Sequence, residues 1–236
     1  MRAANASPYT LDGTNTYVVD GWVIDPGPDD EEHRERVVAA AGGAIAGIVL
    51  THGHPDHAEG APALAERAGG VAVECPAGGE RIGPFDAIAT PGHAPDHVAL
   101  RVGGVVFAGD TVLGTGSVFV APGGGAMAAY LDSLRRLRAL EAEVIAPGHG
   151  PFVWDPAAKL DEYIDHRLER ERRVVAALEA GARTRDELID TAWDDVPFAE
   201  APVLRIAAGV TLDAHLEKLR DEGALPAGVE LPDALR

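Results

Sequence analysis

The chain carries three histidines and one aspartate within six consecutive residues, in the segment His52-Gly53-His54-Pro55-Asp56-His57. This segment follows the apolar run 45–50, which is typical of a buried β-strand. His52 and His54 are two residues apart at the end of that strand, so both side chains can point to one side. Pro55 stops extended pairing and lets a helix begin, which turns Asp56 and His57 toward a second point. The spacing therefore predicts two adjacent metal ions rather than a chance cluster of surface histidines, because loops after strands commonly carry catalytic ligands.

The same layout, a short apolar run followed by a ligand-type residue in a Gly/Pro loop, recurs at four other places. The residues that follow these runs are Asp25, His93, Asp110 and His149. We expect these side chains to lie at one rim of a sheet. Imidazole and carboxylate without thiolate suit zinc, and they also suit iron or manganese, so the ligand types do not name the metal.

The order and spacing of these five motifs resemble the metallo-β-lactamase superfamily over roughly residues 9–150. The resemblance implies an α+β fold, the αββα sandwich, in which two sheets pack together and helices cover both outer faces. Short β-type runs alternate with helical segments in this part of the chain, which agrees with such a fold. We expect a helix over residues 57–68, a hairpin at Gly103-Gly104 and a helix over residues 126–140.

The resemblance also implies a set of ligands. One ion would be held by His52, His54 and His93, the other by Asp56, His57 and His149, with Asp110 bridging both. Two ions roughly 3.5 to 4 Å apart can share a hydroxide and lower its pKa toward neutrality. We therefore expect a dinuclear hydrolase that holds two zinc ions, or iron or manganese, and uses a metal-bridging hydroxide. Asp56 and Asp110 are the expected catalytic carboxylates.

Five other residues are expected to support the site or the fold. Asp25 would orient a ligating histidine or its loop, although an aspartate that caps a Pro-Gly turn is the plainer alternative. His97 begins an alternating apolar run, so we place it outside the ligand set. His33, in an acidic helix, and His215, in the C-terminal helix, are expected to be solvated or packed. Cys75 is the single cysteine, and we expect a buried structural thiol.

From Pro151 onward the chain is almost purely helical. We expect a helix over 156–180, a second helix that Thr184 and Glu187 begin with a capping box, and a third over 202–222. Three helices followed by a short extended tail at 224–231 suggest a small winged-helix-like domain at 155–236, after a catalytic domain at 1–154. Such a domain either covers the active site as a lid or binds nucleic acid.

The second half narrows the resemblance to the β-lactamase-like protein 2 group, which joins the metallo-β-lactamase fold to a C-terminal winged helix. The matching segments are GTNTY at 13–17, TPGHAPDH at 90–97, GDTVLG at 109–114, PGHGP at 147–151, YIDHR at 163–167 and AHLEKL at 214–219. That group includes a single-strand-selective endoribonuclease, and its relatives include thioesterases that release polyketides from carrier proteins. The resemblance thus implies either cleavage of single-stranded RNA or hydrolysis of a small-molecule ester or thioester.

One face of the long helix could serve the substrate. Tyr163, His166, Arg167 and Arg170 are spaced so that they share this face, and could anchor an anionic or carbonyl-bearing substrate. Because Glu162, Glu169 and Glu171 are interleaved with them, a salt-bridged helix is the alternative.

Charge separates the candidate activities. The formal net charge is -18, and residues 155–236 hold 11 lysines and arginines against 19 aspartates and glutamates. A domain that grips phosphate backbones normally shows a basic face. The excess of negative charge argues against cleavage of RNA and favours (thio)ester hydrolysis, including the glyoxalase-II type. A DNA-binding regulator without catalysis is a third interpretation, and the intact ligand set argues against it.

The sequence also bounds the compartment. No apolar stretch approaches the roughly 20 residues of a membrane span, and the N-terminal residues lack the apolar core of an export signal. With a single cysteine, we expect a cytoplasmic protein that does not bind membranes. A secreted β-lactamase is less expected for the same reason. The pattern does not predict the oligomeric state.

Overall fold

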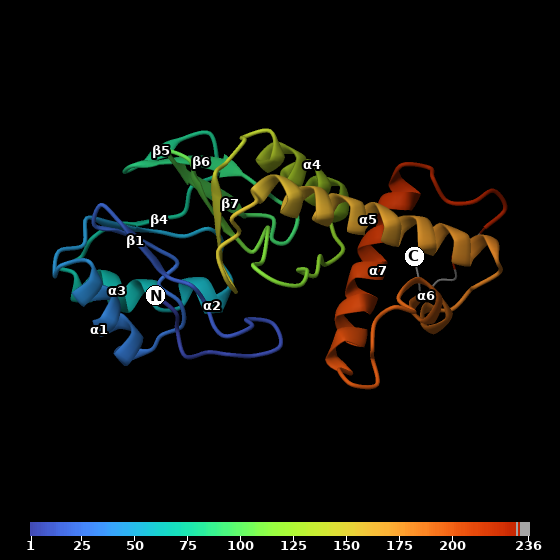
Figure 1. The fold of residues 1–236 in the computed structure, drawn as a ribbon, viewed down its shortest axis with the longest axis horizontal. Coiled ribbons are helices and arrows are strands. Elements are labelled where there is room, and N and C mark those ends of the chain that lie inside the picture. The colour runs from blue at the N-terminus through green and yellow to red at the C-terminus, as the bar shows by residue number, and fades with distance from the viewer. Residues whose placement is uncertain (230, 232–236) are drawn as a thin grey trace.

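The computed structural model, which describes residues 1–229 and 231, contains two β-sheets, both in the left half of Figure 1. The first sheet has the order β1 (Tyr17–Val19), β2 (Trp22–Ile24), β3 (Gly47–Val49) and β4 (Val73–Glu74). The second has the order β5 (Arg81–Ile82), β6 (Phe85–Ala89), β7 (Val98–Val102), β8 (Val105–Gly109) and β9 (Val144–Pro147). The pairs β2–β3, β3–β4 and β8–β9 are parallel, and the other neighbouring strands are antiparallel.

Side chains of the strands alternate between one inner core and two outer cores, as the pleat of a strand requires. On β8, Phe107 faces the core between the sheets, whereas Val106 faces the core under α4 (Ala126–Arg138). On β3, Val49 belongs to the core between the sheets and Ile48 to the core with α1 (Glu31–Ala40) and α3 (Ala61–Arg67). The predicted αββα arrangement is therefore confirmed, as are the hairpin at Gly103 and the helix that starts at Ala126.

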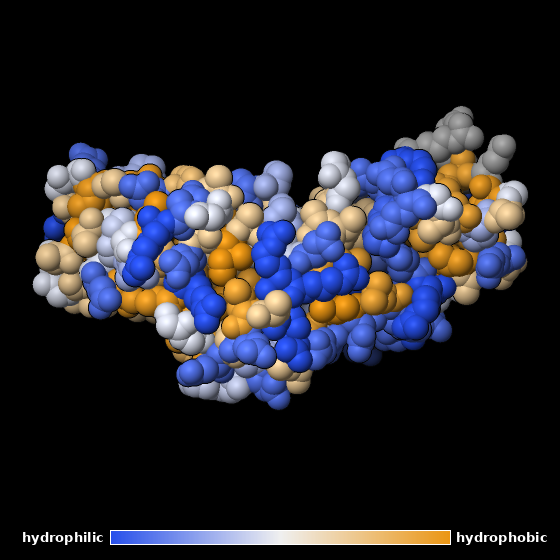
Figure 2. Space-filling view, turned by 90° about the horizontal axis from the view of Figure 1, so that it is seen from above, coloured by the Kyte–Doolittle hydropathy of each residue, from blue (hydrophilic) through white to orange (hydrophobic). Residues whose placement is uncertain are grey.

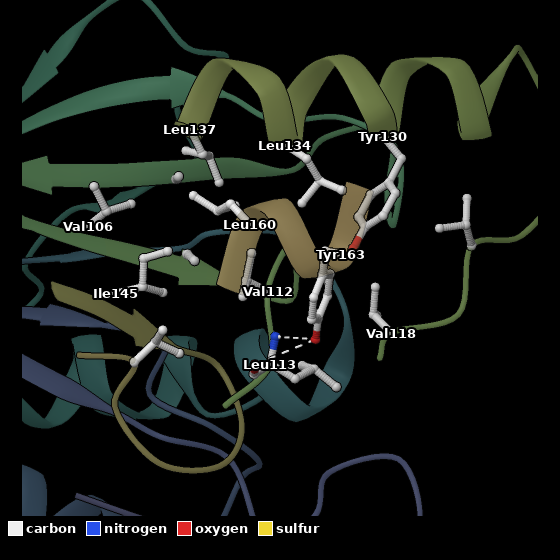
Figure 3. Packing of buried hydrophobic residues seen from close by; sticks show 14 of the residues in the cluster. Val106, Val112, Leu113, Val118, Tyr130, Leu134, Leu137, Ile145, Leu160 and Tyr163 are labelled. Atoms are coloured by element: carbon white, nitrogen blue, oxygen red, sulfur yellow. Dashed lines mark hydrogen bonds between the residues drawn. The ribbon is translucent and has the colours of Figure 1, made fainter. Parts of the chain in front are cut away.

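The core under α4 also holds the segment that follows Asp110. Figure 3 shows Tyr163 pointing into this core, with its hydroxyl toward Leu113. The Tyr163 hydroxyl accepts a hydrogen bond from the Leu113 amide (3.1 Å) and donates one to the Gly116 carbonyl (2.8 Å). Tyr130 donates to the Thr111 carbonyl (2.8 Å). Two buried tyrosines thus fix the loop after β8 to the helices behind it.

The helix predicted over residues 57–68 is broken into α2 (Pro55–Ala58) and α3. The Gly60 amide donates to the Gly27 carbonyl (2.8 Å), and a Cβ at position 60 would lie only 2.8 Å from the Pro28 carbonyl oxygen. The close approach requires glycine, and it turns the chain between the two helices. The Gly27 amide in turn donates to the His57 carbonyl (3.0 Å), so this contact ties the Asp25 loop to the ligand-bearing helix.

The three C-terminal helices predicted from the sequence are confirmed as α5 (Pro156–Glu179), α6 (Arg185–Ala192) and α7 (Val203–Asp221). The capping box at Thr184 is also present. Leu160 in the first half of α5 lies in the core under α4, whereas Val174 in the second half packs with α6 and α7. Figure 1 shows α5 running from the sheets to the other two helices. The boundary at 154/155 stays a prediction, because α5 is shared by both cores.

The predicted extended tail and the winged-helix assignment are not confirmed. Residues 224–229 form turns instead of a strand, because Gly228 has a φ of +76° and the Val229 amide donates to the Pro226 carbonyl (3.1 Å). Leu231 packs in the core of α5, α6 and α7. Residues 230 and 232–236, the rest of this prediction, lie outside the described residues.

Polar residues cover much of the face in Figure 2, and apolar residues show as separate patches between them. Within residues 1–229 and 231, no helix is both long enough and apolar enough to cross a bilayer. Cys75, expected to be buried, is exposed. It follows β4, a two-residue strand at the edge of its sheet, where the side chain is left uncovered.

Candidate metal centre

Seven side chains from four loops converge at one rim of the two sheets. The structure brings together two groups whose ligand atoms lie within 4.8 Å of one another: His52, His54 and His93, and Asp56, His57, Asp110 and His149. They come from the segments after β3, β6, β8 and β9, and Asp56 and His57 lie in α2, which follows β3. All seven residues expected as ligands are therefore neighbours. The two groups match those that the resemblance implies, with Asp110, the residue expected to bridge, in the second group.

Asp110 lies between the two groups. Its Oδ2 atom is 3.3 Å from His149 Nε2 and 3.7 Å from His93 Nε2, and its Oδ1 atom is 3.4 Å from His57 Nε2. Asp56 Oδ2 lies 3.2 Å from His149 Nε2. The carboxylate of Asp110 thus faces histidines of both groups.

The residues fit divalent metal ions. His52 Nε2 and Asp110 Oδ1 are buried, and neither forms a hydrogen bond within the described part of the chain. Buried polar atoms without a partner are costly, and in native structures they commonly mark a ligand or an ion. The donor set consists of imidazole nitrogen and carboxylate oxygen, which suits zinc, iron and manganese.

The electrostatics of the cluster favour a cationic occupant. Burial alone would lower the pKa of His57 and His149, but the nearby carboxylates outweigh it and raise the pKa of His149 to about 9. Burial also disfavours the charged form of Asp110, yet the two histidines hold its pKa well below the usual range. Burial lowers the pKa of His52 and of His93, so their nitrogen lone pairs are free to bind a metal.

Asp25 supports the cluster from behind. It is 2% exposed, and its Oδ1 atom accepts a hydrogen bond from the Thr51 amide (2.7 Å). Its Oδ2 atom accepts one from the Thr51 hydroxyl (2.7 Å) and lies 2.8 Å from His57 Nδ1. A carboxylate on Nδ1 keeps the proton there and leaves Nε2 as the free nitrogen, which faces the cluster.

His97, which the sequence placed outside the ligand set, holds the backbone of Asp110. Its Nε2 atom accepts a hydrogen bond from the Asp110 amide (3.0 Å), so Nδ1 carries the proton and donates to Thr90 Oγ1 (2.8 Å). Its ring stacks on that of His52, with centroids 4.8 Å apart. Burial lowers the pKa of His97 to about 3, so the ring stays neutral. Only the tertiary contact reveals this role, although Pro95-Asp96-His97 lies beside the His93 motif.

His33 and His215 are packed, which is one of the two outcomes expected for them. His33 Nε2 lies 2.8 Å from Thr16 Oγ1, and burial lowers its pKa to about 4. His215 Nδ1 lies 3.4 Å from Glu171 Oε2 in the interface between α5 and α7. Neither belongs to the metal-ligand groups.

A cleft of about 680 Å³ opens over the cluster. Its lining includes His54, Asp56, His93 and Asp110. The walls come from residues 7–11, from the loop that follows β8, and from α5, α7 and the segment between α6 and α7. No local pattern in the chain indicates that its first and last parts meet over the metal ligands.

Of the four residues expected on one substrate-facing side of α5, three line this cleft and one does not. His166, Arg167 and Arg170 border it. Tyr163 is not among the lining residues and lies in the core instead, bonded to the loop after β8. Arg170 is also engaged, because its Nη1 atom donates to Asp195 Oδ1 (2.7 Å) and to the Ala192 carbonyl.

A family model described as the metallo-beta-lactamase superfamily matches residues 9–88 and 76–149, the part of the chain that holds all seven side chains. The chain belongs to the metallo-β-lactamase superfamily. As a member of this superfamily it is a hydrolase, and it carries groups of side chains that could bind metal ions.

Two curated relatives extend the match to the C-terminal helices. A protein of Caenorhabditis elegans named β-lactamase-like protein 2 homolog is 30% identical over 94% of this chain and 83% of its own length. An atrochrysone carboxyl ACP thioesterase of Aspergillus chevalieri is 32% identical over 83% of this chain and 72% of its own length.

Solved structures of other proteins have a similar fold. A metallo-β-lactamase family protein from Thermus thermophilus superimposes with a TM-score of 0.72 at 25% identity, covering 92% of both chains. A second protein, TTHA1623, whose structure was solved in a di-iron-bound form, superimposes with a TM-score of 0.53 at 30% identity, covering 66% of this chain and 96% of its own.

Proposed function

We propose that the protein is a dinuclear metal-dependent hydrolase that cleaves ester or thioester bonds in substrates with an apolar acyl group. The observation that carries this proposal is the cleft over the metal ligands, whose walls are mainly apolar. Trp193, Val196 and Leu204 face it from the C-terminal part, and Val118 and Phe119 from the loop after β8. An apolar wall beside a polar floor suits a substrate that has an acyl chain next to a reactive carbonyl.

The two groups of ligands would hold one ion each, with Asp110 between them. When bound, two divalent ions would supply Lewis acidity toward a carbonyl oxygen and would lower the pKa of a water molecule. The chain itself fixes the geometry: His97 anchors the amide of Asp110, and Asp25 orients the ring of His57. Asp56 and Asp110 border the cleft, so we assign them to the reacting centre.

The loop after β8 links the cleft wall to the metal ligands. The Phe119 carbonyl lies 3.2 Å from His93 Nδ1, so it accepts a hydrogen bond when that nitrogen is protonated. Arg167 and Tyr163 hold this loop from α5. We therefore propose that the C-terminal helices act as a lid that shapes the acyl pocket and supports His93.

The cleft has aromatic rings, those of Phe119 and Trp193, but little free positive charge to bind RNA. Single-stranded RNA is bound by positively charged grooves and by aromatic rings on which bases stack. Of the two arginines in the lining, Arg170 is already paired with Asp195. The net charge of -18 opposes a polyanion further. Thioester cleavage is also the activity named for the Aspergillus chevalieri relative.

Purified protein, assayed before and after chelation, tests the proposal with a matched set of compounds. We expect metal-dependent cleavage of hexanoyl-N-acetylcysteamine thioester, weak cleavage of a phosphodiester, and none of a fluorescent single-stranded RNA. Elemental analysis should find close to two transition-metal ions per chain. Metal-dependent cleavage of the RNA without any turnover of the thioester would contradict the proposal and favour the endoribonuclease.

A further inference from the structure

Arg167, in the middle of α5, is a buried cation in the wall of the cleft. Its exposed fraction is 3%, and its guanidinium lies over the ring of Tyr130, 5.5 Å from the centroid. Its Nη2 atom donates to Ser117 Oγ (2.6 Å) and to the Val118 carbonyl. Its Nε atom is buried and bonded to no group within the described residues.

The acidic groups around Arg167 are committed to other cations. Asp195 pairs with Arg170 at 2.7 Å. Glu171, one turn along α5, pairs with Lys218 at 2.9 Å and lies beside His215. In the described part of the chain no carboxylate lies within 4.0 Å of the Arg167 guanidinium. A buried cation without a carboxylate to balance its charge is costly, and an anionic ligand would balance it.

The position of Arg167 relative to the metal ligands suits a substrate that spans both. Arg167 donates to the Val118 carbonyl, and the next carbonyl, that of Phe119, lies 3.2 Å from His93 Nδ1. One residue step separates the two contacts, which puts the guanidinium on the order of 10 Å from the cluster. A substrate with its reactive carbonyl at the metal ligands could reach Arg167 with a negatively charged end.

We propose that Arg167 forms an anion subsite of the cleft, which binds a carboxylate or phosphate group of the substrate through charge-assisted hydrogen bonds. This inference rests on the proposed (thio)ester hydrolase. The anion could stand at the far end of the acyl chain, as a carboxylate, or on the thiol side, as the phosphate of a phosphopantetheine arm. Arg170 has a different task, because its charge is balanced by Asp195 and its guanidinium stacks on Trp193 at 4.9 Å.

Three thioesters separate these sources. Hexanoyl-N-acetylcysteamine is neutral, the adipoyl monothioester of N-acetylcysteamine adds a carboxylate to an acyl chain of the same length, and hexanoyl-phosphopantetheine adds a phosphate on the thiol side. The quantity compared is kcat/KM for each charged compound divided by kcat/KM for the neutral one. One charge-assisted hydrogen bond predicts a ratio of about 10 to 100 in the wild type, for the compound whose anion reaches Arg167.

Four variants identify the residue responsible. Arg167→Met should bring the ratio close to one, and Arg167→Gln should do the same while it keeps an amide that can bond the Val118 carbonyl. Arg167→Lys should keep part of the ratio. Arg172→Met removes an exposed arginine from the same helix and should leave the ratio unchanged. A wild-type ratio near one for both charged compounds, or an unchanged ratio in folded Arg167→Gln, overturns the anion subsite.

A separate measurement distinguishes failure of the hydrolase proposal from failure of the anion subsite. If no thioester is cleaved, calorimetry with adipate on the metal-loaded protein still tests the subsite, because Arg167→Gln should weaken adipate binding by about 10-fold or more. Adipate binding that is equal in wild type and variant overturns the subsite in that case. Cleavage of all three thioesters without charge preference upholds the hydrolase and rejects the subsite.

Discussion

The substitution Asp25→Asn tests whether the hydrogen bond between Asp25 and His57 controls metal binding. Asp25 accepts hydrogen bonds from the Thr51 amide and hydroxyl and lies 2.8 Å from His57 Nδ1. An asparagine has the same shape but offers one oxygen and one NH2 group. With its NH2 group toward His57, it forces the imidazole proton onto Nε2, the nitrogen that faces the cluster. With its NH2 group toward the Thr51 amide, it leaves two buried donors facing each other.

Both arrangements have a comparable cost. An unsatisfied buried donor lowers the free energy of unfolding by about 1 to 3 kcal/mol. Loss of the partner behind a metal-binding histidine typically lowers metal affinity by about 10- to 100-fold. We therefore expect Asp25→Asn to fold with a lowered Tm, or to keep its Tm and bind the ion at His57 about 10- to 100-fold more weakly.

Competition with a chromogenic chelator measures the affinities of both ions, and thermal unfolding measures the Tm. Asp20→Asn is the matched control, because Asp20 is exposed and has nearly the same left-handed φ, +49° against +48° for Asp25. Any effect of asparagine on that backbone conformation is shared by the two variants. If Asp25→Asn keeps both the Tm and the two metal affinities of the wild type, the assigned role of Asp25 is wrong.

The remaining predictions concern the centre of the cluster and the fold around it. Asp110→Ala should lose most turnover while it stays folded by circular dichroism, since its carboxylate stands between both ligand groups; full activity would exclude a bridging role. His33 has a folded pKa of about 4, below the 6.5 of an unfolded histidine, so the unfolded chain binds the extra proton. Its contribution to the free energy of unfolding is complete above pH 6.5 and is lost as the pH falls toward 4, by at most about 3 kcal/mol. Urea denaturation at pH 7 and pH 5 should show a smaller loss for His33→Gln than for the wild type, and equal losses would contradict this assignment. Arg170→Met should lower the free energy of unfolding by about 1 to 3 kcal/mol, because it leaves the Ala192 carbonyl without its donor; an unchanged urea midpoint would refute the structural role of Arg170.

The positions of the expected ligands could be predicted because most of them follow closely after an apolar run in the chain, whereas their division between two ions came from the family resemblance. His93, Asp110 and His149 stand in Gly/Pro loops after β6, β8 and β9, so local sequence and strand geometry are enough to put them at one rim. The C-terminal helices were equally clear, since their apolar spacing and the Thr184 capping box are local signals.

What could not be predicted depends on contacts between distant segments. The break at Gly60 follows from its contact with the Gly27 carbonyl, and the role of His97 follows from its bond to the Asp110 amide. Cys75 is exposed because β4 forms the edge of its sheet. The residues of a strand do not indicate its position in the order of the sheet. Tyr163 and Arg167 share a helix face, yet one faces the core and the other the cleft.

The 24-residue helix α5 contributes side chains to the hydrophobic cores of both halves of the protein. A helix of this length is about 36 Å long, and its first turns are packed in one core while its last turns are packed in another. Melting of either core removes the support of the other, so we expect the chain to unfold in one cooperative transition rather than in two. Exchange of the C-terminal part for that of a relative is therefore best made inside α5, where both cores keep their own side chains. Such chimeras would reveal which half carries the preference for a substrate.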